Sequence, residues 1–142
     1  MKTLQNILSS KGNQIFSIGP ADSVFDALEE MAQREVGALI VLDGGKVVGI
    51  FSERDYARKI ILVGKSSRET PVSEIMTSRV VCARADLTLE ECLALMTDKR
   101  IRHLPVLQDD DLIGVVSIGD LVKGIIDEQR FRISQLESYI SG

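Results

Sequence analysis

Apolar and polar residues follow each other along the chain in an order that occurs twice. Met31 and Met96 stand 65 positions apart, and the same shift, without a gap, superimposes Val41 on Val106. The shift also matches residues with special chemistry: Gly49 with Gly114, Ser52 with Ser117, and Asp55 with Asp120. A repeat fixes the architecture before any single element does. We therefore expect a tandem duplication.

Each copy opens with a short apolar stretch, expected to be a strand at Ile15–Ile18 and at Val80–Ala83. A helix start follows, because Ser23 with Asp26 and Thr88 with Glu91 have N-cap spacing. Apolar residues then recur at i, i+3, i+4 and i+7, the pattern of one helix face. They are Val24, Ala27, Leu28 and Met31 in one copy, and Leu89, Cys92, Leu93 and Met96 in the other.

Two apolar runs next to a polar turn predict a β-hairpin in each copy. The expected strands are Ala38–Leu42, Val47–Phe51, Leu104–Leu107 and Leu112–Val116. Pro105 lacks an amide hydrogen, so its strand is expected at a sheet edge, or else Pro105 should open the strand. A second helix follows, and each copy is predicted to run strand, helix, strand, strand, helix.

The copies are joined by a polar connector that ends in a helical turn at Glu74-Ile75-Met76. Leu4, Ile7 and Leu8 form an amphipathic N-terminal segment, and apolar positions continue beyond the second copy to Ile140. The tail is expected to pack on a partner chain or back on the module. The expected divisions are an N-terminal segment (1–14), repeat 1 (15–62), a linker (63–79), repeat 2 (80–127) and a helical tail (128–142).

Composition narrows the classes of function. The 142 residues carry 17 Lys plus Arg against 21 Asp plus Glu, and aromatics make up 4%. Without a basic run or stacking platforms, nucleic acid is not an expected partner. No apolar run approaches the roughly 20 residues of a membrane span, and no secretory signal is evident, so we expect no membrane association and a cytoplasmic location.

Two cysteines and one histidine are too few for a zinc site or a disulfide scaffold. No metal or catalytic residues are therefore assigned. Cys82 as a redox thiol is the remaining enzymatic alternative, although no second cysteine or base accompanies it. Cys92, on the apolar helix face, is interpreted as a core residue.

The heptads Gly49–Asp55 and Gly114–Asp120 share the order Gly, two apolar residues, Ser, two variable residues, Asp. Together with Arg102–Val106 and Glu74–Thr77, they resemble the cystathionine-β-synthase (CBS) domain pair, or Bateman module. The likeness covers nearly the whole chain, and the stretch from Ser52 to Ser67 resembles small stand-alone members.

The resemblance implies an α+β fold of two βαββα units, packed sheet to sheet about a pseudo-two-fold axis with two clefts. It implies a non-catalytic regulatory module that binds adenosine-containing ligands, such as AMP, ADP, ATP, NAD(H) or S-adenosylmethionine, and signals occupancy to a partner. A homodimer is expected. No cofactor is required, because the adenine nucleotide or dinucleotide is a regulatory ligand.

Binding of an adenosine-containing ligand is also supported by the chemistry of the residues themselves, without the family resemblance. A carboxylate accepts two hydrogen bonds at once, which suits a ribose diol, and a helix N-terminus favours an anion. Arg102 and His103 gather donors before a strand in an acidic chain, whereas the aligned Gly37 and Ala38 have none. The two sites are therefore expected to differ.

The family likeness and these arguments yield one set of candidate ligand-binding residues. In the first copy and connector they are Ile18, Gly37, Ala38, Ser52, Arg54, Asp55, Lys65 and Ser67. In the second copy they are Ala83, Arg102, His103, Leu104, Pro105, Ser117, Gly119 and Asp120. The resemblance places Ile18, Ala38, Ala83 and Leu104 against adenine, whereas Arg102 and His103, or Arg54, Lys65 and Ser67, are expected at phosphate.

Structural alternatives stay open for the same residues. Each Ser–Asp pair also has capping-box spacing, and Arg102 and His103 could lie on a solvated loop or pair with Asp109–Asp111 on the surface. For the whole chain, the alternative is a constitutive dimeric scaffold without ligand.

Overall fold

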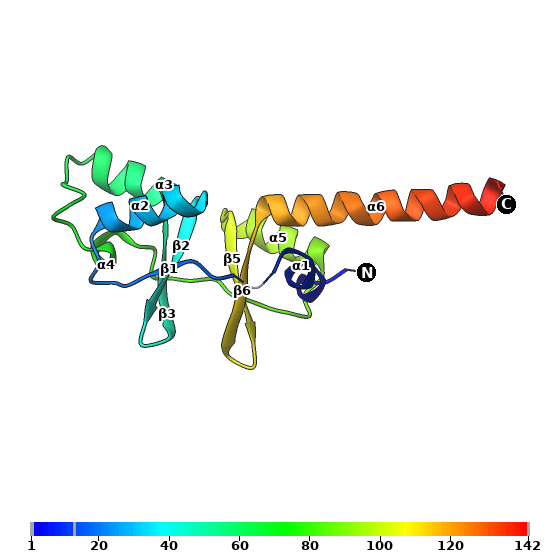
Figure 1. Cartoon of the computed structure of the whole chain (residues 1–142), viewed down its shortest axis with the longest axis horizontal. Coiled ribbons are helices and arrows are strands. Elements are labelled where there is room, and N and C mark those ends of the chain that lie inside the picture. Colours follow the sequence, from blue (N-terminus) through cyan, green and yellow to red (C-terminus); the bar gives the residue numbers. More distant parts are fainter. Residues whose placement is uncertain (1, 13, 142) are drawn as a thin grey trace. The chain divides into compact units, whose positions relative to one another are not determined.

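A computed structural model describes residues 2–12 and 14–141. Residues 1, 13 and 142, which belong to the expected N-terminal segment and tail, lie outside the described residues. The chain divides into two compact units (Figure 1). The first unit is Ile15–Val81, and the second unit combines Met1–Gln14 with Cys82–Gly142.

The first unit has a three-stranded sheet in the order β1-β2-β3, with β1 parallel to β2 and β3 antiparallel to it. Its elements are β1 (Ser17–Ile18), α2 (Val24–Arg34), β2 (Ala38–Asp43), β3 (Lys46–Ser52), α3 (Glu53–Tyr56), the π-helix η1 (Ala57–Ile61) and α4 (Val72–Ile75). The expected order of strand, helix, strand, strand and helix is confirmed.

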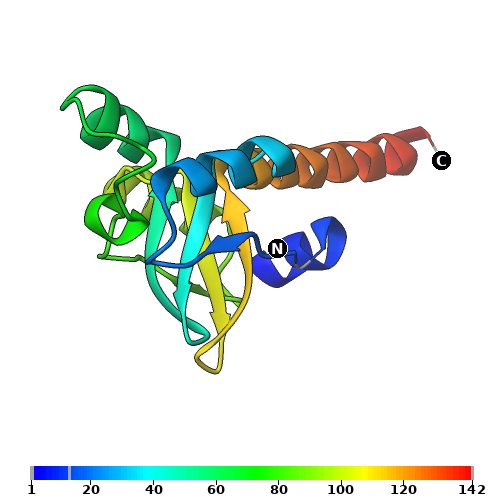
Figure 2. The same cartoon turned by 60° about the vertical axis from the view of Figure 1, so that its left-hand side comes forward.

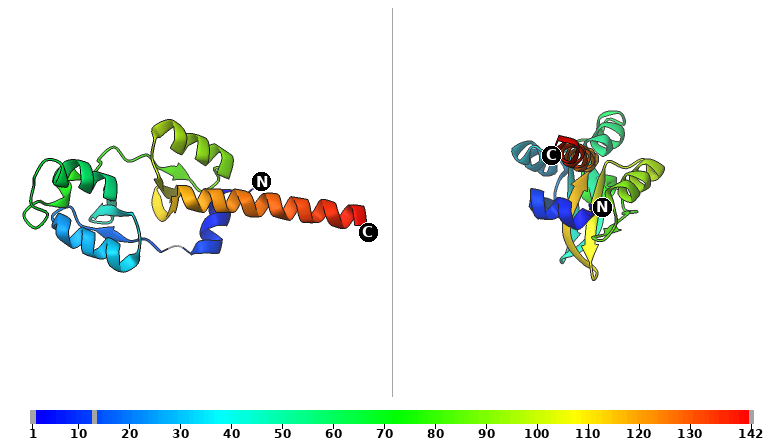
Figure 3. Two further views of the ribbon diagram at one scale, coloured as in Figure 1. Left: turned by 90° about the horizontal axis from the view of Figure 1, so that it is seen from above. Right: turned by 90° about the vertical axis from the view of Figure 1, so that its right-hand side faces the viewer.

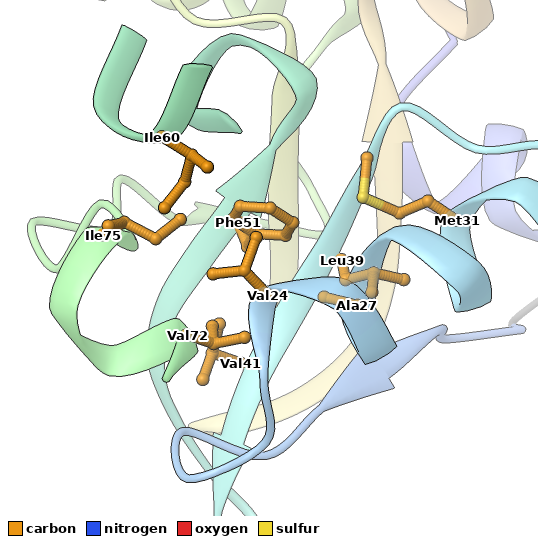
Figure 4. Close-up of a cluster of buried hydrophobic side chains, with 9 residues drawn as sticks. All are labelled: Val24, Ala27, Met31, Leu39, Val41, Phe51, Ile60, Val72 and Ile75. Atoms are coloured by element: carbon orange, nitrogen blue, oxygen red, sulfur yellow. The ribbon is translucent and has the colours of Figure 1, made fainter. Parts of the chain in front are cut away.

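Buried side chains from α2, β2, β3, η1 and α4 form the core of the first unit (Figure 4). The cluster contains Val24, Ala27, Met31, Leu39, Val41, Phe51, Ile60, Val72 and Ile75. Met31, from the predicted apolar helix face, is therefore a core residue.

The second unit repeats this plan, with strand order β4-β5-β6. Its elements are α1 (Leu4–Lys11), β4 (Ala83–Arg84), α5 (Leu89–Lys99), β5 (His103–Gln108), β6 (Asp111–Ser117) and α6 (Ile118–Ser141). Cys92 and Met96 are buried as expected. Figure 2 shows the chain passing from β6 directly into α6. The mixed α+β fold class is confirmed.

The expectation for Pro105 is wrong. Pro105 is the third residue of β5, and β5 is the central strand of its sheet. In the first unit, the aligned Ile40 donates its N–H to the carbonyl of Phe16 at 3.1 Å. Proline cannot make that bond. The first strand of the second unit begins at Ala83, one residue later than the aligned strand of the first unit, which begins at Ser17. The expected strands were too long at their starts, because Ile15–Phe16 and Val80–Cys82 lie outside them.

A glycine on the last strand of each sheet allows a close approach by a segment from outside the repeat. A Cβ on Gly49 would lie 2.5 Å from Sδ of Met76, which directly follows α4. A Cβ on Gly114 would lie 2.6 Å from Cδ2 of Leu8 on α1. The linker therefore completes the first unit, and the N-terminal helix completes the second.

The closing helices of the two units differ. In the first unit α3 has four residues and continues as a π-helix that ends at Ile61. In the second unit α6 runs for 24 residues without interruption, which confirms the expected continuation past the repeat.

The last turns of α6 extend beyond the rest of the second unit (Figure 3). Their large apolar residues are 54–85% exposed: Phe131, Ile133, Leu136, Tyr139 and Ile140. The tail therefore does not fold back on the described part of the chain, which was one of the two expected arrangements.

Shortening the Leu8 side chain, which packs α1 against the sheet, is expected to destabilise the second unit. Leu8 is fully buried against the Gly114 backbone, so Leu8→Ala should lower the free energy of unfolding by about 2–5 kcal/mol. Urea denaturation measures this change. The matched variant Leu62→Ala, at a position 77% exposed, should change it by less than about 0.5 kcal/mol. Equal effects of the two variants would contradict the docking of α1.

Candidate functional site

Both Ser–Asp pairs form capping boxes at the start of the closing helices. In the first unit, Ser52 N donates to Asp55 Oδ2 at 3.0 Å and Asp55 N donates to Ser52 Oγ at 3.2 Å. In the second unit, the equivalent bonds of Ser117 and Asp120 measure 2.8 and 3.1 Å. The capping interpretation is confirmed for both pairs. It also fixes each carboxylate at the junction of a strand and a helix N-terminus.

Candidate donors of the second copy lie beside its capping box. His103 pairs with Ser117 across β5 and β6, and the carbonyl of Arg102 accepts the N–H of Ile118 at 2.9 Å. In the first unit Ala38 pairs with Ser52 in the same way.

The first unit thus has the same backbone geometry without the donor side chains. The carbonyl of Gly37 accepts the N–H of Glu53 at 3.1 Å, as Arg102 does in the second unit. Neither Gly37 nor Ala38 has a side chain that can donate a hydrogen bond.

The carboxylate of Asp55 is almost fully occupied by its own unit. Oδ2 accepts from both the N–H and the hydroxyl of Ser52, at 3.0 and 3.1 Å. Oδ1 accepts from Thr77 Oγ1 and lies 3.1 Å from Lys59 Nζ. An ionised carboxylate offers about four acceptor positions, and the side chain is 8% exposed. Asp55 therefore has no remaining position for a ligand hydroxyl in this arrangement.

The carboxylate of Asp120 is more open. Its Oδ2 accepts from Ser117 N at 2.8 Å and from Lys11 Nζ at 2.7 Å. Both bonds end on Oδ2, and in the described part of the chain no hydrogen bond ends on Oδ1. The side chain is 26% exposed, and Lys11 also donates to the carbonyl of Val115 at 3.0 Å.

These contacts favour the ionised form of Asp120. Burial alone raises the pKa of this carboxyl, but the hydrogen bonds and charge of Lys11 and the hydrogen bonds of Ser117 outweigh it. The pKa of Asp120 therefore lies below its ordinary value of 3.8. At neutral pH the group is a charged hydrogen-bond acceptor.

The remaining candidates are distributed over both units. Ile18 is on β1, Arg54 on α3, Ala83 on β4, Leu104 and Pro105 on β5, and Gly119 on α6. Leu104 and Pro105 are buried. Lys65 lies in the loop after η1, 4.0 Å from Glu74, and the backbone carbonyl of Ser67 accepts the N–H of Phe25. The role of these two connector residues at phosphate stays a prediction.

The alternative in which Arg102 pairs with the acidic turn Asp109–Asp111 is not observed. Among the described residues, no ion pair joins Arg102 to Asp109–Asp111. Arg102 is exposed just before β5.

Sequence reasoning missed three residues that contact the carboxylates: Lys11, Lys59 and Thr77. Thr77 could have been found, because it ends the motif Glu74–Thr77. Lys59 follows Asp55 at i+4, a standard helical ion-pair spacing. Lys11 had no such signal, since 109 positions separate it from Asp120.

The cysteines do not supply a reactive group. Burial raises the pKa of the Cys82 thiol, and it raises that of Cys92 to about 11. A higher pKa means less thiolate at neutral pH, which is the nucleophilic form. In the described part of the chain, no three His, Cys, Asp or Glu side chains gather as a metal site, and no helix has the length and apolar character to cross a membrane.

The family model described as "CBS domain" matches residues 8–62 and 72–127. The chain belongs to the CBS-domain family. The mitochondrial CBS domain-containing protein CBSX3 of Arabidopsis thaliana is 40% identical over 149 residues, which cover 99% of this chain and 72% of that protein.

Solved CBS-domain structures agree with the fold. The CBS-domain protein NE2398 is 49% identical with a TM-score of 0.84, covering 88% of this chain and 98% of that one. A CBS-domain protein from Burkholderia ambifaria, described as a putative signal-transduction protein, is 47% identical with a TM-score of 0.87, covering 90% and 96%. The recognition of a CBS-domain pair is confirmed, and proteins of this kind are typically regulatory rather than catalytic.

A more distant likeness, 22% identical with a TM-score of 0.77, is to the CBS pair of protein MJ0100. It covers 90% of this chain and 98% of that one, and that structure is a complex with 5′-methylthioadenosine and S-adenosyl-L-methionine.

The lowered pKa of Asp120 predicts a specific acid dependence of stability. Its ionised form stabilises the folded state above about pH 3.8, and this contribution is lost as the pH falls through the lower folded-state pKa. Urea denaturation of wild type and Asp120→Asn at several pH values measures it. The difference in unfolding free energy should be constant near neutral pH and should shrink in the acid range. A difference that stays constant throughout would contradict the pairing.

Proposed function

We propose that this protein is a non-catalytic regulatory module that binds an adenosine-containing ligand in its second copy and signals occupancy to a partner. The observation that carries the proposal is the carboxylate of Asp120, held ionised at a helix N-terminus with Oδ1 available. A ribose diol presents two adjacent hydroxyl donors, and one carboxylate can accept both.

The neighbours of Asp120 suit the rest of such a ligand. The side chain of His103 starts from the strand position opposite Ser117, and Arg102 precedes it on an exposed segment. Both side chains are able to donate hydrogen bonds to phosphate oxygens, and Arg102 also supplies positive charge. We therefore expect AMP, ADP, ATP or NAD(H) rather than an uncharged nucleoside as the physiological ligand.

The first copy is proposed to be a poor ribose site. Its Asp55 already accepts from Ser52, Thr77 and Lys59, and it is nearly buried. A diol would have to displace the Thr77 hydroxyl and the Lys59 ammonium, whereas Asp120 keeps one oxygen open. The ligand pair held by MJ0100 has the adenosine chemistry expected here.

Loss of the Asp120 carboxylate is expected to weaken adenosine binding. Asp120→Ala removes a charged acceptor, which costs about 1.5–3 kcal/mol, or roughly 10- to 100-fold in affinity. Calorimetric titration of adenosine measures it. Asp98→Ala, at a carboxylate 77% exposed on α5, is the matched control and should leave the affinity unchanged. Unchanged affinity in a folded Asp120→Ala protein would leave capping as the only role of this residue.

Arg102 is expected to recognise phosphate. Arg102→Ala should weaken AMP binding, leave adenosine binding unchanged, and reduce the salt dependence of AMP affinity, because phosphate contacts involve net charge. Titrations at two ionic strengths test both effects. The control is Arg84→Ala, which removes an exposed arginine of the same unit. Equal losses for AMP and adenosine would contradict the phosphate role.

The exposed end of α6 favours a second candidate, a constitutive dimeric scaffold. Ile126, Ile133 and Ile140 recur every seven residues on one exposed stripe, with Leu136 between them. Such a stripe fits a second copy of the same helix. Thermal-shift measurement separates the candidates, since a ligand at about 100 times its dissociation constant stabilises a regulatory module by about 2.7 kcal/mol and leaves an empty scaffold unchanged.

A further inference from the structure

Lys11 occupies the carboxylate that the proposed ligand needs. Its ammonium lies 2.7 Å from Oδ2 of Asp120 and 3.0 Å from the carbonyl oxygen of Val115. With Ser117 N on the same oxygen, the acceptor positions of Oδ2 are taken. A first ribose hydroxyl can bind Oδ1 directly. The bidentate arrangement, with one ribose hydroxyl on each carboxylate oxygen, forms only when Lys11 leaves Oδ2.

The first unit makes the equivalent contacts in a different way. There the carbonyl of Ile50, aligned with Val115, accepts the backbone N–H of Thr77 at 2.8 Å, and the Thr77 hydroxyl donates to Asp55. Thr77 is held by a two-way backbone pairing with Ile50. In the second unit one lysine side chain, 38% exposed, replaces both of these contacts. A flexible side chain can leave without breaking backbone pairing.

We propose that Lys11 is an autoinhibitory residue that competes with the ribose diol for Asp120 and is displaced when an adenosine ligand binds; this inference rests on the proposed function. Lys11 is the last residue of α1, so the proposed exchange takes place at the C-terminal end of that helix.

The packing of α1 allows this exchange without unfolding the helix. Leu4, Ile7 and Leu8 are buried in the second unit, with Leu8 against Gly114 and Ile7 beside Gly124. These apolar contacts hold the helix independently of the lysine. The last turn is closed by the N–H of Gly12, which donates to the carbonyl of Leu8 at 2.9 Å, and this backbone bond does not involve the lysine side chain.

The test is calorimetric titration of full-length wild type and Lys11→Met with adenosine and with 2′,3′-dideoxyadenosine. Removing the competing ammonium should tighten adenosine binding about twofold to fivefold, the upper part of the range of a partly exposed charge pair. It should not change binding of the dideoxy compound, which has no ribose hydroxyl for Asp120. Lys11→Arg keeps the charge and should bind adenosine no more tightly than wild type.

Lys99→Met is the matched control, because it removes an exposed lysine of the same unit whose only ion pair among the described residues is a 4.0 Å contact with Asp98. It should bind adenosine as wild type does. Thermal unfolding of all variants confirms that each is folded.

The outcomes separate the two proposals. If neither wild type nor Lys11→Met binds adenosine, the proposed function is wrong. If wild type binds and Lys11→Met binds equally or more weakly, Lys11 does not compete and only this inference is overturned. A gain for the dideoxy compound equal to that for adenosine would also overturn it, because the effect would not involve the ribose hydroxyls.

Discussion

The close approach at two glycines determines most of what is distinctive about this protein. At Gly49 and Gly114 the absence of a side chain lets Met76 and Leu8 reach the backbone of the last strand. Each sheet is thereby covered by a segment that does not belong to its own repeat. The same docking brings Thr77 to Asp55 and Lys11 to Asp120, because these residues follow Met76 and Leu8 along the chain. Packing and charge at the two carboxylates are thus consequences of one steric constraint.

Much of the fold followed from the sequence because local rules and the repeat agree. The 65-residue shift relates α2 to α5 residue for residue, from Val24–Arg34 to Leu89–Lys99. Both helices begin at the predicted caps, Ser23 and Thr88. The hairpins extend one residue or more beyond the apolar runs, since backbone pairing continues into the polar ends of a strand. Capping, periodicity and turn chemistry are short-range effects, and a single sequence records them directly.

Other features depended on contacts between distant residues. The position of Pro105 in a central strand is tolerated because β4 pairs with β5 only at Val106 and Leu107, beyond the missing amide. A rule about proline alone could not include the length of the neighbouring strand. In the same way, the aligned heptads assigned the same candidate role to both carboxylates and did not show that their bonding partners differ. Asp55 and Asp120 differ because the linker supplies Thr77 to Asp55, whereas α1 supplies Lys11 to Asp120. The 65-residue shift does not relate these two segments.

The unbroken course of α6 gives the second unit a mechanical property. The helix starts at the residue after Ser117, so its first turn contains Asp120, and at about 1.5 Å per residue its 24 residues span about 36 Å. A tilt of about 10° at the carboxylate would move the far end by about 6 Å, as a rigid lever of that length. Any small rotation of α6 about its first turn would therefore become a displacement of several ångströms at the exposed end of the helix.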